Sequence, residues 1–528
     1  MTERSFNIYG TCRPDTDYMV DITERVEVVK KMVDLGLYFT INRPRQYGKT
    51  TLISALTRRL SNEYICARIS FEGLGDESFE NAKAFCETLM DKIQTALSDS
   101  PAGYDADYIE NWMNPEITNF RLLSKHITEM CRSHSVVLLI DEVDKTSNNR
   151  VFLHFLGMLR DKYLQRKDDI GYTFKSVVLA GVYDIRNLKL KLETEGVYTP
   201  SGHQGDILNS PWNIAAEFNI DMSFHTDEIA AMLADYSSDN SVGMDCVKVA
   251  ETIYEYTSGY PFLVSRICKT LDEDPALAGD WTQSGAIGAI RQLIRRNDTL
   301  IDDLTKNVES NPDLYSFLYN ILILGKRMEY TLTVPTIQRA AMFGFIKDGD
   351  GNVKISNKIF EMVLTNYFIA KEDLNGSRRR ITGYEGDIVR NGRFDMEYCL
   401  TKFSEHFRQI FMDKDAPFIE EHGRMLFLTY LKPLINGRGF YHIESRLTDQ
   451  RRLDLVVDFG LDQFIIELKL WYGETSHEKA YHQLAGYLKS IGAATGYLLT
   501  YDFRKEKNRA PKTKWVEWDG LRIFDVMI

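Results

Sequence analysis

The chain of 528 residues is too long for a single hydrophobic core, and its 44% hydrophobic and 27% charged residues are typical of a globular protein. A net charge of −12 at pH 7 argues against a protein that coats nucleic acid, because phosphate binding depends on Lys and Arg. Seven cysteines without a Cys-x-x-Cys pair argue against a disulfide framework or a zinc knuckle, and no apolar run reaches membrane-spanning length. We therefore expect a cytoplasmic protein of several domains with no membrane segment.

Helices and strands alternate in the first third of the chain. Apolar residues recur with helical period over residues 22–35, and further helices are predicted over 51–60 and about 151–166. Short apolar runs between these helices predict buried strands at 37–41, 135–140 and 176–182. This alternation predicts an α/β fold with a doubly wound parallel sheet.

The remainder of the chain predicts three further regions. A helical region extends to about residue 300, and residues 313–368 predict a small helical unit with a hairpin at an Asp-Gly-Asp-Gly turn, which indicates a winged helix. The polar, basic stretch 371–380 predicts a linker. After helices over about 394–432, the pattern predicts three strands, a helix and a strand.

A phosphate-binding loop is predicted between the first strand and its helix. Such a loop needs backbone N–H groups at a helix N-terminus, a lysine that reaches the phosphates and a hydroxyl for Mg²⁺, and Gly48, Lys49 and Thr50 supply them. Arg43 replaces the first glycine of the usual G-x-x-x-x-G-K-[ST] pattern. The turn of the loop must therefore come from residues other than a glycine at this position.

An acidic pair follows the second predicted strand. Asp141 and Glu142 end the apolar run SVVLLI, where phosphoryl transfer to water requires a metal-ordering aspartate and a water-activating glutamate. The carboxyl ends of strands are also where nucleotide pockets open in such sheets. The loop and the acids together predict an ATP site with Mg²⁺.

The segment DYMVDITERVEVVKKMVDLGLYFTINRPRQYGKTTLISAL resembles the opening of the AAA-ATPase-like family, a group of P-loop NTPases whose loop typically reads RPR-x-(F/Y)-GK-(S/T). The resemblance covers about residues 5–370. Within it, SGYPFLVSRICKTL is similar to the glycine-x-proline segment of related STAND-like signal-transduction ATPases, which implies that Gly259 to Pro261 approach the base.

This resemblance implies a role for each loop residue and acid. It assigns Lys49 to phosphate, Thr50 and Asp141 to Mg²⁺, and Glu142 to the hydrolytic water. Arg43 and Arg45 either contact phosphate or only pack the loop, and both roles stay open. The nucleotide-binding loop residues are then Arg43, Pro44, Arg45, Gln46, Tyr47, Gly48, Lys49, Thr50 and Thr51.

A second candidate site lies near the end of the chain. Glu467 and Lys469 share one face of a predicted strand, because alternate side chains of a strand point the same way, and Asp454 lies on the preceding strand of a predicted hairpin. Such a set can hold one or two Mg²⁺ ions and leaves an amine to polarise the attacking water. It predicts phosphodiester hydrolysis, with an ordinary exposed strand as the alternative.

The order of elements and these residues resemble the PD-(D/E)XK nuclease superfamily over about residues 415–502. The resemblance makes Asp454, Glu467 and Lys469 catalytic, with Asp454 and Glu467 as metal ligands. It implies a restriction-endonuclease-like α/β domain. Further catalytic positions are matched by Glu421, or alternatively Glu420, on the first helix and by Gln483 and Tyr487 on a later helix.

The two resemblances imply an ATP-binding and ATP-hydrolysing regulator fused to a Mg²⁺-dependent nuclease that acts on nucleic acid, with DNA as the first expectation. The alternative is a non-cutting, nucleotide-dependent switch or scaffold that binds nucleic acid or protein, and a homo-oligomer is left open. The implied domains are a P-loop AAA-ATPase-like domain (5–225), a helical lid (226–300), a winged-helix-like domain (301–370), a linker (371–384) and a nuclease-like domain (385–528).

The charge is unevenly distributed between these domains. Residues 385–528 carry 21 Lys and Arg against 22 Asp and Glu, a net charge of −1, so most of the excess acid lies before them. A basic cluster occurs near the chain end, and it is either a solvated edge or a nucleic-acid contact. Its members are Arg504, Lys505, Lys507, Arg509, Lys512 and Lys514.

Overall fold

The structure is a computed structural model of the chain. The residues that it describes are 4–113, 116–146, 150–182, 212–296, 298–323, 326–374, 388–390, 393–411, 420–435, 439–442, 455–460, 462–502 and 512–528. They form two compact units. The first unit comprises residues 1–254, 259–274 and 338–344, and the second comprises residues 255–258, 275–337 and 345–528.

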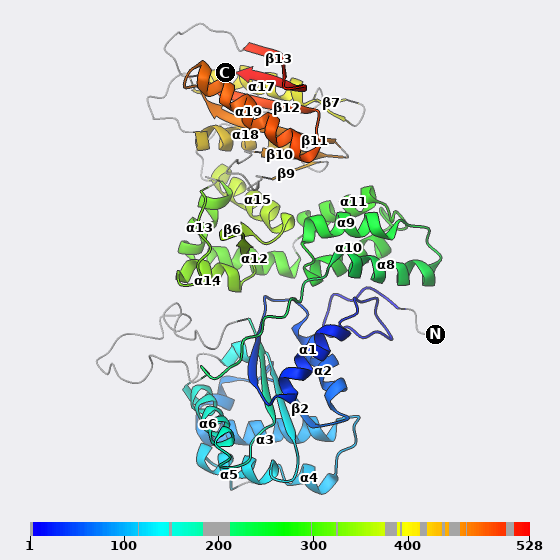
Figure 1. Cartoon of the computed structure of the whole chain (residues 1–528), viewed down its shortest axis with the longest axis vertical. Coiled ribbons are helices and arrows are strands. Elements are labelled where there is room, and N and C mark those ends of the chain that lie inside the picture. Colours follow the sequence, from blue (N-terminus) through cyan, green and yellow to red (C-terminus); the bar gives the residue numbers. More distant parts are fainter. Residues whose placement is uncertain are drawn as a thin grey trace, which may run out of the picture. The chain divides into compact units, whose positions relative to one another are not determined.

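A four-stranded parallel sheet forms the centre of the first unit. Its strand order is β1-β4-β3-β2. The sheet and its helices are drawn in blue and cyan in Figure 1. Every residue of β3 and β4 is buried, as expected for the apolar runs of a sheet covered on both faces. The predicted parallel sheet is therefore confirmed. The strands are β1 (Tyr38–Asn42), β2 (Ile65–Ser70), β3 (Val136–Asp141) and β4 (Ser176–Gly181).

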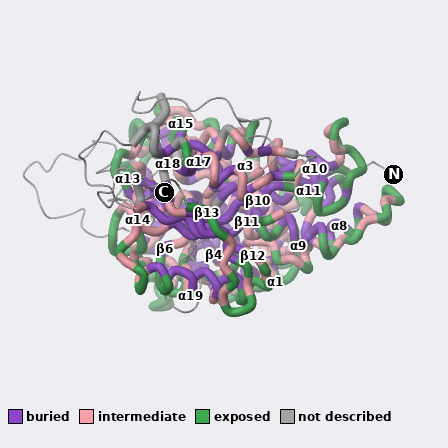
Figure 2. Tube along the Cα trace, turned by 90° about the horizontal axis from the view of Figure 1, so that it is seen from above, coloured by how far each residue is buried: buried purple, intermediate pink, exposed green. Residues whose placement is uncertain are grey.

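Helices cover both faces of this sheet, because successive strand residues enter different cores. Leu138 packs in a core with residues of α3, α5 and α6, whereas Leu139 packs in a second core with residues of α1 and α2. All residues of β3 and β4 are buried; buried residues along the chain are drawn in purple in Figure 2. The helices are α1 (Thr23–Asp34), α2 (Lys49–Leu60), α3 (Ala82–Ser98), α4 (Ala106–Glu110), α5 (Phe120–Met130) and α6 (Arg150–Lys167), with short 3-10 turns η1 (Asp76–Phe79) and η2 (Val143–Thr146).

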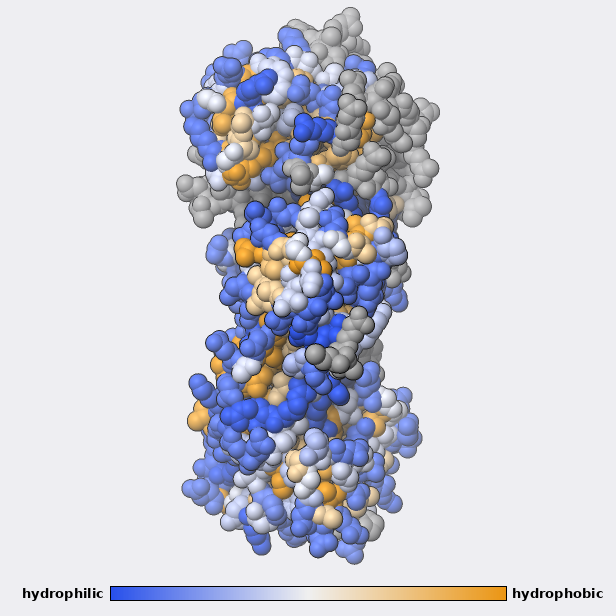
Figure 3. Space-filling model, turned by 90° about the vertical axis from the view of Figure 1, so that its right-hand side faces the viewer, coloured by the Kyte–Doolittle hydropathy of each residue, from blue (hydrophilic) through white to orange (hydrophobic). Residues whose placement is uncertain are grey.

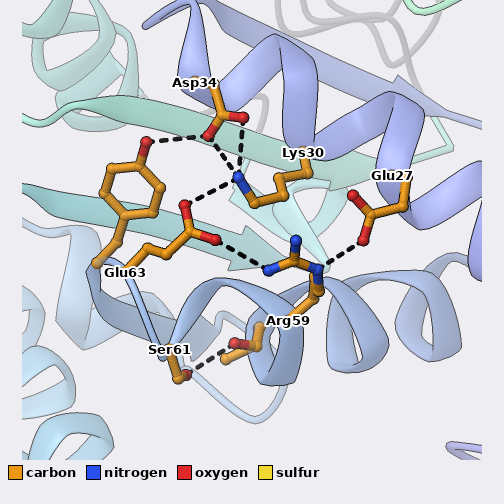
Figure 4. A network of polar contacts seen from close by, with 8 residues as sticks. Glu27, Lys30, Asp34, Arg59, Ser61 and Glu63 are labelled. Atoms are coloured by element: carbon orange, nitrogen blue, oxygen red, sulfur yellow. Dashed lines mark hydrogen bonds and ion pairs between the residues drawn. The ribbon is translucent and has the colours of Figure 1, made fainter.

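A network of ion pairs ties α1 to α2 (Figure 4). Lys30 of α1 lies 2.9 Å from Asp34 and 3.0 Å from Glu63, which follows α2. Arg59 of α2 lies 2.5 Å from Glu27 of α1 and 2.9 Å from Glu63. Each ion pair is partly exposed and individually weak. Because Lys30, Arg59 and Glu63 each take part in two pairs, the network as a whole fixes α1 and α2 relative to each other. The helix that begins at Lys49 is thereby anchored.

Helices α8 to α15 follow, and a hairpin interrupts them. Asp350 and Gly351 both have positive φ values, +57° and +83°, which a two-residue type I′ turn requires. Residues 371–374, which were predicted to belong to the linker, continue α15 instead, and the rest of the predicted linker lies outside the described residues. The elements are α8 (Thr226–Asn240), α9 (Cys246–Thr257), α10 (Pro261–Glu273), α11 (Gln283–Arg295), α12 (Thr299–Glu309), α13 (Pro312–Leu322), α14 (Pro335–Met342), β5 (Ile346–Gly349), β6 (Asn352–Ile355) and α15 (Lys358–Leu374).

A six-stranded mixed sheet ends the chain, with strand order β13-β14-β12-β11-β10-β9. The predicted order of helix, three strands, helix and strand is present as α18, β9, β10, β11, α19 and β12. The antiparallel hairpin β13–β14 was not predicted. The elements are β7 (Val389–Arg390), β8 (Arg393–Phe394), α17 (Met396–Phe411), α18 (Glu420–Ile435), β9 (Gly439–His442), β10 (Leu455–Phe459), β11 (Asp462–Leu470), α19 (Glu474–Ile491), β12 (Thr495–Tyr501), β13 (Lys512–Trp518) and β14 (Leu521–Met527).

The surface is mainly polar on the face shown in Figure 3, where hydrophilic residues surround smaller hydrophobic groups. Among the described residues, no helix combines the length and the apolar character that crossing a bilayer requires.

Candidate functional site

The predicted phosphate loop connects β1 to α2 and turns through two positive φ values. Gln46 has φ +55°, and Gly48, which precedes the first residue of α2, has φ +81°. Glycine adopts this left-handed conformation without steric cost, so Gly48 can start the helix abruptly. The free N–H groups of the first turn of α2 then face the end of the loop, as anion binding requires.

Lys49 points back into the loop. Its Nζ donates to the carbonyl oxygens of Arg43 at 2.9 Å and Pro44 at 2.8 Å, and only 7% of the residue is exposed. Burial lowers the pKa of Lys49, while the acids Asp144 and Glu142 oppose that shift. The ammonium group of Lys49 therefore lies inside the loop, where its hydrogen-bond partners are neutral carbonyl oxygens that a phosphate oxygen can replace.

Three acids gather at the carboxyl end of β3. Asp141 is the last residue of the strand and is 4% exposed, and its Oδ1 accepts from the backbone N–H of Glu142 at 3.0 Å. Glu142 has φ +56°, a strained value for this residue type, and burial together with Asp141 raises its pKa. Asp144, which the sequence reasoning missed, accepts a hydrogen bond from the backbone of Val182 just after β4.

Arg43 packs the loop against a later segment. Its guanidinium donates to the carbonyl oxygens of Asn42 at 2.8 Å and Ile220 at 2.6 Å, and it lies 5.1 Å from the ring centre of Phe218. Arg43 therefore packs the loop, and its contact with phosphate stays a prediction. Arg45, in contrast, is exposed on the loop.

The glycine-x-proline segment contacts the loop directly. Gly259 has φ +72°, and an added Cβ would lie 2.0 Å from the carbonyl oxygen of Phe224. This close approach brings the Tyr260 hydroxyl to the carbonyl oxygen of Arg45, to which it donates, and sets the Tyr260 ring edge-on to Tyr47 at 4.6 Å. The approach of Gly259 to Pro261 to a nucleotide base stays a prediction.

The other loop residues have local partners. Tyr47 shares a hydrogen bond of 2.8 Å with Ser223 through the two hydroxyl groups. The hydroxyl of Thr51 accepts from the backbone N–H of Cys12 at 3.2 Å. Thr50 lies half buried in the first turn of α2. A Cβ added to Gly344 would lie 2.6 Å from Cγ of Pro44, so the segment after α14 also packs on the loop.

Glu467 and Lys469 lie together on β11. Lys469 Nζ is 2.7 Å from Glu467 Oε1, the glutamate is fully buried, and the lysine side chain is 25% exposed. Ile465, two residues earlier on the same face, packs in a core with residues of α19. The two charged side chains therefore project from the face of the sheet that α19 covers.

Of the other residues predicted for this second site, Gln483 and Tyr487 are described by the structure and Asp454 is not. Asp454 lies outside the described residues; the residue after it, Leu455, pairs with Ile466, the residue before Glu467. Tyr487 is buried in the core that contains Ile465, and Gln483 lies half buried on the same helix. These two assignments stay predictions.

Glu420 and Glu421 are the first residues of α18, which packs on the other face of the sheet. The hydroxyl of Tyr501 donates to the carbonyl oxygen of Gly423 in α18 at 2.8 Å. Its neighbour Thr500 points the opposite way, and its hydroxyl lies 3.4 Å from Nδ1 of His477 in α19. The structure therefore does not bring α18 to the face of Glu467, and the assignment of Glu421 stays a prediction.

A buried polar cluster, which the sequence did not indicate, lies on the α19 face. Oδ2 of Asp525 on β14 accepts from the Tyr481 hydroxyl at 2.6 Å and lies 3.0 Å from Nε2 of His477. Lys514 Nζ lies 3.7 Å from the same oxygen. The cluster links α19 to both strands of the unpredicted hairpin.

Comparison with known proteins identifies one family. A family model described as an AAA-like domain matches residues 12–366, and no curated protein sequence matches the chain. Three similar solved structures are a Walker-type ATPase of Pyrococcus abyssi (13% identity, 68% of this chain and 99% of that chain, TM-score 0.46), the ORC2 protein of Aeropyrum pernix (12%, 70% and 99%, 0.35) and the RuvB Holliday junction branch migration motor of Thermotoga maritima (14%, 63% and 92%, 0.31).

Proposed function

Because the chain belongs to the AAA-like domain family, we propose that its first half binds ATP with Mg²⁺ at residues 43–51 and hydrolyses it. The observation that carries this proposal is the placement of Lys49, whose ammonium lies inside the loop at the N-terminus of α2 and beside the acids that follow β3. The hydroxyl of Thr50 and the carboxylate of Asp141 are hard oxygen donors of the kind that Mg²⁺ prefers.

Each residue has a distinct task in this proposal. Lys49 would exchange the loop carbonyls for phosphate oxygens, which are stronger acceptors because they are charged. Bound Mg²⁺ would supply neutralisation of phosphate charge. Glu142 would accept the proton of the attacking water, and the upward shift of its pKa by burial brings that carboxyl closer to neutral pH, where a general base works best.

The test is to measure ATP binding by calorimetry and phosphate release by the purified chain with Mg²⁺. Lys49→Ala should weaken ATP binding about 10- to 100-fold, whereas Glu142→Gln should keep binding and lose turnover. Wild-type turnover that both variants retain would contradict the proposal.

We further propose that the C-terminal sheet carries a Mg²⁺-dependent site that hydrolyses phosphodiester bonds of nucleic acid under control of the bound nucleotide. A fully buried carboxylate is costly unless it has a charged partner, and Glu467 has Lys469 at 2.7 Å on the same strand face. This pair supports the proposal, as does the order of helices and strands around it. Asp454 and Glu467 would hold the metal, and Lys469 would polarise the attacking water.

This second activity has its own test. Plasmid, linear and single-stranded DNA and RNA would be incubated with the full chain and Mg²⁺, beside Glu467→Gln, Lys469→Ala and the exposed control Glu478→Ala on α19. The proposal predicts cleavage by wild type and control and none by the other two. Absence of cleavage on every substrate would leave the non-cutting switch as the function of this sheet.

A further inference from the structure

The turn after β3 holds Glu142 in a conformation that needs support from its surroundings. The φ of Glu142, +56°, lies in the left-handed region, which residues with a side chain adopt only where the surrounding structure holds them there. On one side, the backbone N–H of Glu142 donates to Oδ1 of Asp141 at 3.0 Å. On the other side, Val143 is fully buried in the core that also contains residues of α3, α5 and α6. The residue after it, Asp144, supplies a third contact.

Asp144 connects this turn to the end of the neighbouring strand. Its Oδ2 accepts a hydrogen bond from the backbone N–H of Val182, the residue that follows β4. Because β3 and β4 are adjacent in the sheet, Asp144 bridges the two strands just beyond their last paired residues. A hydrogen bond to a charged acceptor is stronger than one between neutral groups, so this contact restrains the turn.

Gly181, the last residue of β4, provides the space for the Asp144 carboxyl group. A Cβ added to Gly181 would lie 2.7 Å from Oδ1, 3.0 Å from Cγ and 3.0 Å from Oδ2 of Asp144. These distances are shorter than van der Waals contact allows. The φ of Gly181 is not positive, so the backbone itself accepts a larger residue here. A side chain at this position would therefore displace the Asp144 carboxylate.

The same end of β4 also holds the start of the phosphate loop. The carbonyl oxygen of Gly181 accepts from the backbone N–H of Arg43 at 3.3 Å, and the carbonyl oxygen of Arg43 accepts from Nζ of Lys49 at 2.9 Å. Among the acids that oppose the lowering of the Lys49 pKa by burial, Asp144 has the largest effect. The end of β4 is therefore joined both to the loop that carries the lysine and to the turn that carries the acids.

We propose that Asp144 is a positioning residue, which ties the Asp141–Glu142 turn to the end of β4 and thereby orients the Glu142 carboxylate toward the attacking water. This inference rests on the proposed ATP hydrolysis, in which Glu142 accepts the proton of that water. A general base must lie within hydrogen-bond reach of the proton that it takes, and a displacement of about 1 Å can cost about 100-fold in rate. Loss of the Asp144 contact therefore lowers kcat and leaves the nucleotide-binding loop in place.

Two other roles for Asp144 make different predictions. A charge role, toward Lys49 or toward bound Mg²⁺, requires the carboxylate, so Asp144→Asn would be as slow as Asp144→Ala. The positioning role requires only an acceptor for the Val182 N–H, and the amide oxygen of asparagine is such an acceptor. A purely structural role lowers thermal stability and leaves the kcat of the folded protein unchanged.

The experiment measures turnover and nucleotide affinity separately, on the full chain with Mg²⁺. Phosphate release at saturating ATP gives kcat, calorimetry with ADP gives Kd, and thermal unfolding shows whether each variant is folded. Asp144→Ala should lower kcat about 10- to 100-fold and leave the Kd for ADP close to that of wild type. Asp144→Asn should keep kcat within about fivefold of wild type, because a neutral acceptor replaces a charged one.

Gly181→Ala tests the same contact from the neighbouring strand. Its methyl group displaces the Asp144 carboxylate, so kcat should fall by about as much as in Asp144→Ala. In the double variant the methyl group occupies the space that the carboxylate leaves, so the two losses should not multiply. The matched control is Gly157→Ala on α6, where an added Cβ meets open space, and this control should turn over ATP as wild type does.

Three results would overturn the positioning role alone, beside a wild type that hydrolyses ATP. They are unchanged kcat in Asp144→Ala, an asparagine variant as slow as the alanine variant, and a double variant in which the two losses multiply. Absence of phosphate release by a wild type that binds ADP is a different result. It would refute the proposed hydrolysis and, with it, the positioning role.

Discussion

Replacing Gly259 with alanine tests whether the glycine-x-proline segment is held against the phosphate loop. Alanine at φ +72° costs about 1–2 kcal/mol through the left-handed conformation alone. Its Cβ would also lie 2.0 Å from the carbonyl oxygen of Phe224, so the segment must move and weaken the 2.8 Å hydrogen bond from Phe224 N–H to Gly259 O. Overpacking of this kind costs about 1–3 kcal/mol and the hydrogen bond about 1 kcal/mol, so together with the conformational cost we expect about 3–6 kcal/mol in total.

The assay is thermal unfolding followed by calorimetry, with Gly103→Ala as the control. Gly103 has φ +67° with no atom within 4 Å of an added Cβ, so that variant should lose only the about 1–2 kcal/mol of conformational strain. Gly259→Ala should also weaken ATP binding, because Tyr260 would move away from the loop carbonyl that it contacts. Equal destabilisation by the two variants, with unchanged ATP affinity, would refute the reasoning.

Three further predictions concern single side chains. Lys49→Ala should weaken ATP binding about 10- to 100-fold in calorimetry, because it removes charged hydrogen bonds worth about 1.5–3 kcal/mol, whereas the exposed Lys31→Ala should bind as wild type does. Burial raises the pKa of Glu142 in the folded chain. The protonated Glu142 carboxyl therefore stabilises the folded state at low pH, and this contribution to the free energy of unfolding is lost as the pH rises through the raised pKa. Nucleotide-free Glu142→Gln should therefore melt above wild type at pH 7 to 8, with a gap that narrows toward about pH 4, and a gap independent of pH would contradict this. Tyr481→Phe should lose about 1.5–3 kcal/mol in urea unfolding because it removes the 2.6 Å hydrogen bond to Asp525, while Tyr472→Phe, at a residue 76% exposed, should lose almost nothing; equal losses would count against the cluster.

Features encoded by contiguous residues could be predicted from the sequence. Three of the four strands of the first sheet are apolar runs that were predicted within one residue of their observed bounds, whereas β2 was not predicted. The hairpin at Asp350 and Gly351 followed from the turn preference of those residues. The phosphate loop and Asp141 are likewise marked by short patterns next to such runs.

Contacts between distant segments could not be predicted. Tyr260 reaches the carbonyl of Arg45 across 215 positions, and Asp144 binds the backbone after β4, which no local pattern reveals. The packing role of Arg43 depends on the carbonyl of Ile220, in a segment without regular periodicity. These residues act through the tertiary fold.

The sequence of the last hairpin contains a turn signal. Asp519 and Gly520, with φ values of +54° and +80°, form the two-residue turn between β13 and β14. An Asp-Gly pair between two runs that contain Trp, Val, Ile and Phe predicts such a hairpin. Recognising it would have placed Lys512 and Lys514 on an edge strand instead of in a general basic tail.

The central claim is that nucleotide bound in the first half controls phosphodiester hydrolysis in the second. The most direct measurement is the initial rate of DNA cleavage with Mg²⁺, with and without ATP, for wild type and Lys49→Ala. The account predicts a rate that changes with ATP in wild type and does not change in Lys49→Ala. Cleavage that ATP leaves unchanged in both proteins, or no cleavage in either, would contradict it.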